Sequence, residues 1–238
     1  MEDKKVALVT GANKGIGYAI AEGLGRSGYT VIVGARDDSR RDSAVEKLRA
    51  ADIDAFGVAL DVTSDASVIS AASTIEERIG RLDVLVNNAG ISGRTDAGAQ
   101  EPTTLDLSVL QTVLETNIFG VIRTTNAMLP LLRRAPSPRI VNMSSDMGSL
   151  TLQTGPMLAA YAPSKTMLNS ITAQYARAFT DTKIIINAVC PGYVATDFTG
   201  FNSPRTADQG AAIALRFATI PDDGPRGGFF NDDGVVPW

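Results

Sequence analysis

The chain has 238 residues, a size at which a single α/β domain can bury most of the surface that the unfolded chain exposes. Lys and Arg number 22 against 26 Asp and Glu, and the formal net charge of −4 argues against a protein that binds nucleic acid or an anionic membrane surface. There is no histidine and only one cysteine, which excludes histidine-based catalysis and an intrachain disulfide. The same two counts disfavour a zinc site, so we expect no metal.

No apolar run approaches the roughly 18 residues of a membrane span. Lys4 and Lys5 are followed by a short strand-like segment and not by the longer apolar stretch of a signal peptide. Together with the low cysteine content, these features predict a cytoplasmic protein that does not enter a membrane.

Short, nearly continuous apolar segments alternate with helical segments along the chain, as expected of parallel strands buried on both faces. We expect strands at 6–10, 30–35, 55–60, 82–87, 139–144 and 183–189, and a short last strand at 228–230. We expect helices at 16–27, 39–50, 66–79, 105–134, 161–179 and 207–218, with Pro130 ending or kinking the fourth. This alternation predicts one α/β domain over residues 1–238, a doubly wound parallel sheet of about seven strands flanked by helices.

In such a sheet, ligands bind at the carboxyl ends of the strands. The loops that leave those ends begin near Gly11, Arg36, Asp61, Asn88, Ser145 and Pro191. We therefore expect the chemistry of this protein in these six loops.

The loop after the first strand carries three glycines in the run TGANKGIG. Glycine lets the backbone approach a pyrophosphate, and the N-terminus of the following helix offers free N–H groups to an anion. The spacing differs from the G-x-G-x-x-G pattern of the usual dinucleotide site, but the position after the first strand predicts a phosphate-binding turn. Its candidate residues are Gly11, Asn13, Lys14, Gly15, Ile16 and Gly17.

The end of the second strand bears on the choice between NAD and NADP. An acidic residue there binds the ribose 2′-hydroxyl of NAD, whereas an arginine accommodates the 2′-phosphate of NADP. Asp37 and Asp38 favour NAD, but Arg36 comes first off the strand and Asp38 is expected to cap the next helix. Since Lys14 adds a second positive charge nearby, we expect NADP(H).

Tyr161 and Lys165 stand four residues apart at the start of a predicted helix, so they share one helix face. A free phenol has a pKa near 10, and a nearby ammonium stabilises the phenolate and lowers that value. The pair is therefore a candidate acid–base device in a chain without histidine. Ser144 and Ser145 end the fifth strand on the same sheet edge.

At this point the sequence resembles the classical short-chain dehydrogenase/reductase family, with a Rossmann-type fold. The matching positions run through the whole chain in the family's order. They are the turn from Thr10 to Gly17, Asp61, Val62, Asn87, Asn88, Ala89, Gly90, Asn117, Ser145, Tyr161, Lys165, Pro191, Gly192, Tyr193, Val194, Ala195 and Thr196. The amino-acid sequences of the glycine turn and of the Gly34–Asp37 segment are most similar to those of NADPH-dependent carbonyl reductases.

The resemblance implies four catalytic residues. Tyr161 would protonate a carbonyl oxygen, Lys165 would lower the pKa of Tyr161 and hold the nicotinamide ribose, and Ser145 would hydrogen-bond the carbonyl. Asn117 would hold a water molecule that links Lys165 to solvent. Further cofactor contacts are implied for Asp61 and Val62 (adenine), Asn88, Ala89 and Gly90 (ribose), and Pro191, Gly192, Val194 and Thr196 (carboxamide side).

The spacing of the catalytic serine departs from the family pattern. Many members have the serine 13 residues before the tyrosine, which here would be Gly148, whereas Ser145 lies 16 before it. We infer three extra residues within 147–158, and Ser144 and Ser149 stay open as alternatives. The long insertion of some monomeric carbonyl reductases is missing here, so we expect a homodimer or homotetramer through the helices at 105–132 and 161–179.

The expected activity is NADPH-dependent reduction of a small-molecule ketone or aldehyde. The alternative is an alcohol or hydroxysteroid-type dehydrogenase that works mainly in the oxidative direction. The chain is short for a sugar-nucleotide epimerase, and a cofactor sensor without activity is disfavoured by the full catalytic set. Met147, Met157, Tyr193, Phe198 and Phe201 suggest an apolar pocket, while Trp238 could line it, contact another subunit or pack on the surface.

Overall fold

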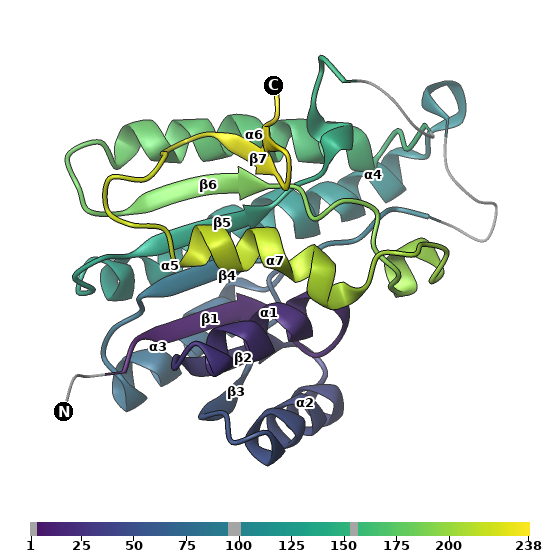
Figure 1. Ribbon diagram of the computed structural model, residues 1–238. Helices are drawn as coiled ribbons and strands as arrows, with labels where there is room; N and C mark the ends of the chain where they lie inside the picture. Colours follow the sequence, from purple (N-terminus) through teal and green to yellow (C-terminus); the bar gives the residue numbers. More distant parts are fainter. Residues whose placement is uncertain (1–3, 95–100, 153–156) are drawn as a thin grey trace.

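The computed structural model describes residues 4–94, 101–152 and 157–238. They form one sheet of eight strands with helices on both faces (Figure 1). The strands are β1 (Val6–Thr10), β2 (Thr30–Ala35), β3 (Ala55–Ala59), β4 (Val84–Asn87), β5 (Arg139–Met143), β6 (Ile185–Val189), β7 (Phe229–Asn231) and β8 (Gly234–Val235). Their order is β3-β2-β1-β4-β5-β6-β7-β8, and every neighbouring pair is parallel except β7 and β8. The predicted doubly wound α/β sheet is therefore confirmed.

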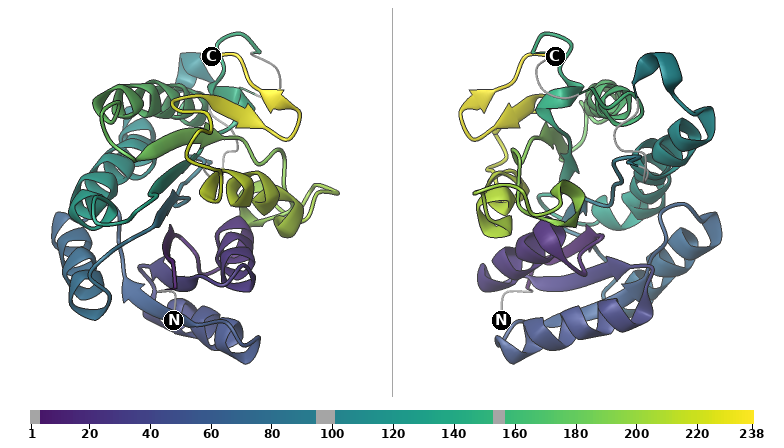
Figure 2. Two further views of the ribbon diagram at one scale, coloured as in Figure 1. Left: turned by 60° about the vertical axis from the view of Figure 1, so that its left-hand side comes forward. Right: turned by 90° about the vertical axis from the view of Figure 1, so that its right-hand side faces the viewer.

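The helices lie in two layers, one on each face of the sheet (Figure 2, left). One layer contains α1 (Gly15–Arg26), α2 (Asp38–Ala50) and α7 (Ala207–Ala218), and the other contains α3 (Asp65–Arg78), α5 (Gly120–Leu132) and α6 (Tyr161–Ala178). Strand β1 serves both layers: Ala7 and Val9 join the first hydrophobic cluster, and Val6 and Leu8 join the second. This explains why the strand has no polar face.

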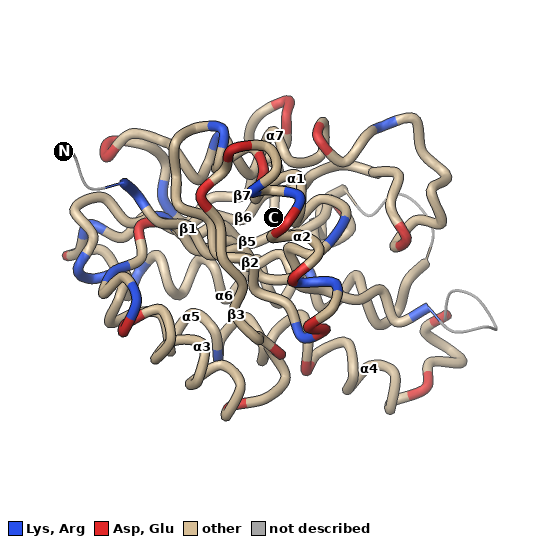
Figure 3. Tube along the Cα trace, turned by 90° about the horizontal axis from the view of Figure 1, so that it is seen from below, with Lys and Arg blue, Asp and Glu red and all other residues tan. Residues whose placement is uncertain are grey.

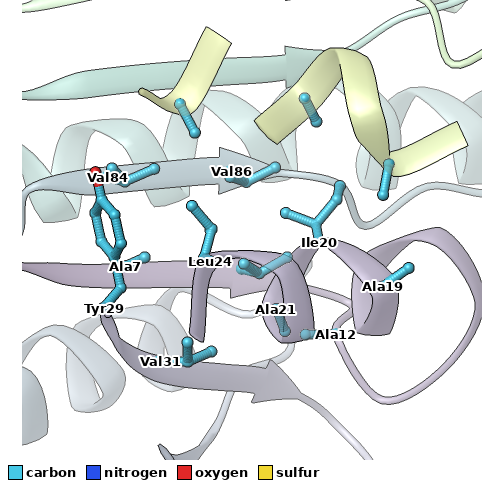
Figure 4. Packing of buried hydrophobic residues seen from close by; sticks show 14 of the residues in the cluster. Ala7, Ala12, Ala19, Ile20, Ala21, Leu24, Tyr29, Val31, Val84 and Val86 are labelled. Carbon is cyan, nitrogen blue, oxygen red and sulfur yellow. The ribbon is translucent and has the colours of Figure 1, made fainter. Parts of the chain in front are cut away.

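Helix α1 packs its apolar side onto the centre of the sheet (Figure 4). Ile20 and Leu24 are fully buried and belong to the same cluster as Val84 and Val86 of β4. Because the glycine turn leads directly into α1, this packing fixes the start of the helix over the carboxyl ends of β1 and β4.

The predicted fourth helix is interrupted in the structure. In place of one helix over 105–134 there are a 3₁₀ turn η1 (Pro102–Thr104), α4 (Leu107–Leu114), a π-helical turn η2 (Glu115–Phe119) and α5. Pro130 lies inside the last turn of α5, which ends at Leu132. The proline removes only the one hydrogen bond that its own N–H would donate to the Asn126 carbonyl, and the helix continues for two residues beyond it.

The C-terminal segment adds a strand that the sequence patterns do not predict. Strand β8 pairs with β7 in an antiparallel hairpin, and the carbonyl of Trp238 accepts hydrogen bonds from the N–H and the hydroxyl of Thr151. The Trp238 ring stacks on Phe229 with the ring centroids 6.0 Å apart. Trp238 is thus partly packed against the end of the sheet.

Acidic and basic residues alternate along much of the chain, as the trace around α2 shows (Figure 3). Within the described part of the chain, no helix has both the length and the hydropathy required to cross a membrane. The same residues contain no group of three His, Cys, Asp or Glu side chains placed to share a metal ion.

Candidate active site

The loops named by the sequence motifs meet at one edge of the sheet. Strands β1, β4, β5 and β6 are consecutive neighbours, so the loops that follow them lie side by side. The sheet reverses its winding between β1 and β4, and in open α/β sheets ligands bind at such a point.

The glycine turn fits a bound phosphate. Gly11 and Gly15 have φ of 63° and 56°, which other residues rarely adopt. A Cβ atom on Gly17 would lie 2.4 Å from the Gly11 carbonyl oxygen and 2.4 Å from Asn88 Nδ2, so no side chain fits there. The first turn of α1 contains no acidic residue, and Lys14 at its N-cap makes no side-chain capping bond. The N–H groups at this helix start are therefore free to face an anion.

Hydrogen bonds join the ends of β1 and β4. The Thr10 hydroxyl accepts the N–H groups of Asn88 and Ala89, each at 2.9 Å, and Asn88 Nδ2 donates to the Thr10 carbonyl at 2.9 Å. The glycine turn and the 88–90 segment, both predicted to bind the cofactor, are thus held together. The turn also approaches the loop after β6, because a Cβ on Gly15 would lie 3.3 Å from Thr196 Cγ2.

The acids after β2 are engaged elsewhere. Asp37, and not Asp38 as the sequence suggested, is the N-cap of α2: its side chain accepts the Arg40 N–H at 2.9 Å. The helix begins one residue earlier than expected, which places Asp38 in the first turn, where it pairs with Arg41. Arg36 is exposed at the end of β2. Both acids are thus bonded within their own helix, and contact between Arg36 and a 2′-phosphate stays a prediction.

Lys14 has a partner that the sequence did not indicate. Its ammonium forms an ion pair with Asp197 across 2.8 Å, with both side chains about half exposed. The hydrogen bond from Lys14 holds the pKa of Asp197 below its usual range. Such an exposed pair is worth about 1 kcal/mol or less, so a phosphate can compete for Lys14.

Asp61 and Val62 begin the loop after β3. Burial by itself would raise the pKa of Asp61, but hydrogen bonds from the Thr63 hydroxyl and N–H bring it below its usual value. Asp61 is thus an ionised acceptor in the loop next to Arg36. Val62 is buried, and a Cβ on Gly120 would touch its side chain at 2.8 Å.

Tyr161 and Lys165 lie on the first turns of α6, and both are more than nine-tenths buried. Burial raises the pKa of Tyr161 above its ordinary value and outweighs the effect of the Ser145 hydroxyl, which lies near that of Tyr161 and by itself lowers the pKa of the phenol. Lys165 Nζ lies 5.4 Å from the Tyr161 ring centre and donates to the Met143 carbonyl at 2.7 Å. Burial lowers the pKa of Lys165 to about 8.

Burial is thus the main influence on the pKa of Tyr161 in this structure, and the lowering of that pKa by Lys165 stays a prediction. The phenol has lost its hydration, and the ammonium bonds a backbone carbonyl instead of the phenol oxygen. Tyr161 is a neutral phenol at pH 7 and can donate a proton.

The structure separates the three candidate serines. The Ser144 hydroxyl donates to Asn169 Oδ1 at 2.6 Å, and the Ser149 hydroxyl donates to the Pro237 carbonyl at 2.6 Å. Both groups are buried and directed away from Tyr161, whereas Ser145 reaches the tyrosine hydroxyl. Part of the segment inferred to hold three extra residues, 153–156, lies outside the described residues.

Asn117 lies on the π-helical turn η2. Its Oδ1 accepts the Ile91 N–H at 2.9 Å, and its Nδ2 donates to the Ile91 carbonyl and to the Ser164 hydroxyl, each at 3.0 Å. A Cβ on Gly90 would lie 3.2 Å from Asn117 Oδ1 and 3.8 Å from Lys165 Nζ. Asn117, Gly90 and Lys165 are thus close together, as the motifs predict.

The sulfur of Cys190 joins the loops after β5 and β6. It accepts the N–H groups of Asp146 at 3.2 Å and Gly192 at 3.4 Å. The same loop carries the other predicted cofactor contacts, Pro191, Gly192, Val194 and Thr196. Val194 is buried, and its Cγ2 would lie 2.6 Å from a Cβ placed on Gly210. Burial raises the pKa of the Cys190 thiol to about 12, so it is no nucleophile.

An aromatic side chain packs against Tyr161. The ring of Phe198, on the 3₁₀ turn η4 (Asp197–Thr199), lies 5.1 Å from the Tyr161 ring at an interplanar angle of 59°. Three further apolar residues of the loops that flank the site in sequence have exposed side chains: Met157, Tyr193 and Phe201. One buried polar residue of the same region, Asn169, was missed by the sequence analysis, which had no signal for it beyond its place one helical turn after Lys165.

Comparison with known proteins agrees with this geometry. A profile of the short chain dehydrogenase family matches residues 5–207. Short-chain dehydrogenase/reductase 1 of Saponaria officinalis is 35% identical over 299 aligned positions that cover 100% of this chain and 97% of the relative. Carbonyl reductase [NADPH] 1 of Rattus norvegicus is 30% identical and covers 99% of both chains.

A solved structure, NADPH-bound carbonyl reductase from chicken fatty liver, has a TM-score of 0.87 at 29% identity and covers 99% of both chains. The 299 aligned positions of the Saponaria relative exceed the 238 residues of this chain, so that relative contains inserted segments that are missing here. The profile match over most of the chain, the relatives along its whole length and the shared sheet show that this protein belongs to the short-chain dehydrogenase family.

Proposed function

We propose that this protein reduces a ketone or aldehyde to an alcohol with NADPH. The observation that carries the proposal is the buried pair of Tyr161 and Lys165, with the partly buried Ser145 beside Tyr161, in the same site as a glycine turn shaped for phosphate. The similarity to an NADPH-bound carbonyl reductase supports the same activity. The roles proposed for single residues in cofactor binding and catalysis rest on the chain's own side chains.

The glycine turn would hold the pyrophosphate of the cofactor. Free N–H groups at the start of α1 and the missing side chains of Gly11 and Gly17 suit a close anion. Arg36 and Lys14 would bind the 2′-phosphate, and Asp61 with Val62 would lie beside the adenine. Asn88, Ala89, Gly90, Pro191, Gly192, Val194 and Thr196 would line the ribose and carboxamide.

When bound, NADPH would supply the hydride. Tyr161 donates its hydroxyl proton to the carbonyl oxygen of the substrate, for which its neutral, buried phenol is suited. The Ser145 hydroxyl hydrogen-bonds the same oxygen and stabilises the negative charge that develops on it. Lys165 stabilises the phenolate left on Tyr161, and Asn117 would hold the water that returns a proton from solvent.

The test is oxidation of NADPH and of NADH by the purified protein with a panel of activated ketones and aldehydes. We expect NADPH to be consumed far faster than NADH, and only when a carbonyl is present. The reverse assay offers NADP⁺ or NAD⁺ with the matching alcohols. Binding of NADPH without turnover of any carbonyl, but with rapid alcohol oxidation, would contradict the reductase assignment and support the oxidative alternative.

We also propose that the chain forms a homodimer or homotetramer through α4, α5 and α6. Leu107, Phe119 and Met167 on or between these helices are exposed apolar side chains. Light scattering should report a mass that is a multiple of 25.0 kDa. A single 25.0 kDa species at micromolar concentration would contradict this assembly.

A further inference from the structure

Asn169 makes a contact that links two parts of the active site. It lies on α6, one helical turn after Lys165, and is 2% exposed. Its Oδ1 accepts the Ser144 hydroxyl at 2.6 Å, and its Nδ2 donates to the Gly148 carbonyl at 3.2 Å. These two partners lie on either side of Ser145. One amide therefore holds both ends of the segment that presents the serine to Tyr161.

The serine-bearing segment touches α6 with no spare room. A Cβ on Gly148 would lie 2.8 Å from the Lys165 carbonyl carbon and 2.9 Å from Lys165 Cβ. The 3₁₀ turn η3 (Asp146–Gly148) is therefore pressed against the backbone of the helix at the catalytic lysine. In such close packing, a shift of the segment along the helix would change how the Ser145 hydroxyl approaches Tyr161.

We propose that Asn169 is a positioning residue that keeps the segment carrying Ser145 in register with the helix carrying Tyr161 and Lys165. The proposal rests on the proposed function for its effect on rate. A primary amide offers both an acceptor and a donor, as Ser144 and Gly148 require. An apolar residue would leave both partners buried without a bond, and an ionised carboxylate would face the Gly148 carbonyl.

Thr172 provides a matched control on the same helix. It is fully buried, three residues beyond Asn169, and its Oγ1 accepts from Asn142 Nδ2 at 2.9 Å and donates to the Leu168 carbonyl at 2.8 Å. It ties α6 to Asn142 of β5, and its bonds do not involve the segment from Ser144 to Gly148. Loss of Thr172 therefore weakens the helix–sheet contact and leaves the serine segment held.

The kinetic experiment compares Asn169→Ala with Thr172→Val. Because misplacement of a catalytic group by about 1 Å can cost about 100-fold, we expect Asn169→Ala to lower kcat by about 10- to 100-fold. The dissociation constant for NADPH should change less than about twofold, since the glycine turn is untouched. Thr172→Val should lower the melting temperature to a similar extent and keep kcat within about twofold. A kcat loss equal in both variants, or none in Asn169→Ala, would overturn the proposal.

Asn169→Asp tests the same bond if the alanine variant does not fold. A protonated carboxyl can donate to the Gly148 carbonyl, while an ionised one cannot. The kcat of this variant relative to wild type should therefore fall as the pH rises. A ratio that is constant across the pH range would count against the proposal.

Hydrogen exchange decides the positioning role without any turnover. We expect the amides of Asp146, Gly148 and Ser149 to exchange faster in Asn169→Ala than in wild type, and unchanged in Thr172→Val. If the wild type reduces no carbonyl, the proposed function fails, yet this comparison still shows whether Asn169 holds the segment. Unchanged exchange in Asn169→Ala would overturn the proposal even if the reductase activity is found.

Discussion

The two sides of the site are built in different ways. The cofactor side, the turn from Thr10 to Gly17, is a backbone turn whose Gly17 has no room for a side chain, with the exposed Lys14 within it and the exposed Arg36 after β2. The catalytic side consists of the buried side chains of Tyr161 and Lys165 and the partly buried Ser145, with Lys165 held by the distant Met143 carbonyl. Changes on the first side should therefore act on binding, and changes on the second side should act on the rate of the chemical step.

The largest expected effect comes from the catalytic side. Tyr161→Phe removes the proton donor but keeps the ring that packs against Phe198. Since general acid catalysis contributes about 10²- to 10⁴-fold, kcat should fall within that range. NADPH affinity, measured by fluorescence titration, should change little. A variant that keeps more than a tenth of the wild-type kcat would show that another group supplies the proton.

Gly17→Ala tests the cofactor side by filling the turn. The new methyl would collide with the Gly11 carbonyl and with Asn88 Nδ2, both 2.4 Å away, so the turn must shift. Overpacking of this kind costs about 1–3 kcal/mol of stability, and we expect NADPH binding to weaken by at least tenfold. Gly28→Ala is the control because a Cβ there meets nothing within 4 Å, although its φ of 87° makes it strained as well. Equal loss of NADPH affinity in both variants would contradict a specific role for the turn.

Arg36→Ala sharpens the comparison by separating two cofactors. A charged hydrogen bond is worth about 1.5–3 kcal/mol, so NADPH should bind about 10- to 150-fold more weakly. NADH has no 2′-phosphate, and its affinity should barely change. Isothermal titration with both cofactors measures the difference. Equal losses for NADPH and NADH would show that Arg36 does not read the 2′-phosphate.

The smallest expected effect near neutral pH is the decrease in kcat as Lys165 loses its proton. Burial lowers the pKa of Lys165 to about 8, so the ammonium is mostly present at pH 7 and is lost as the pH rises. If the reaction needs the charged form, kcat should fall to about half at pH 8 and about a tenth at pH 9. The side chain in Lys165→Arg stays charged at these pH values. Whatever kcat this variant has, it should therefore not decrease between pH 7 and pH 9. A wild-type rate that stays flat to pH 10 would exclude the requirement.

The same contrast explains what the sequence could and could not predict. The strand runs, the glycine turn and the Tyr161–Lys165 pair are local patterns, and each predicted strand is found within two residues of its predicted ends. The π-helical turn around Asn117 and the antiparallel strand β8 were missed. Neither has a periodicity of its own, because both depend on packing against distant segments.

The site shows the same limit. The place of Arg36 followed from the end of β2, but the cap of α2 was assigned to Asp38 and belongs to Asp37, because helix ends are poorly marked by composition. Among three neighbouring serines, spacing could not identify the one that reaches Tyr161. That choice depends on Asn169 and on the Pro237 carbonyl, which lie 25 and 88 residues away from Ser144 and Ser149 in the chain.

The buried thiol of Cys190 gives this protein a built-in reporter. It is the chain's only cysteine, and two N–H groups from different loops enclose its sulfur. With its pKa raised to about 12, it should be inert to alkylating reagents while those loops are closed. Its labelling rate then measures how often the loops after β5 and β6 separate, and a ligand that bridges them would slow that rate in proportion to its occupancy.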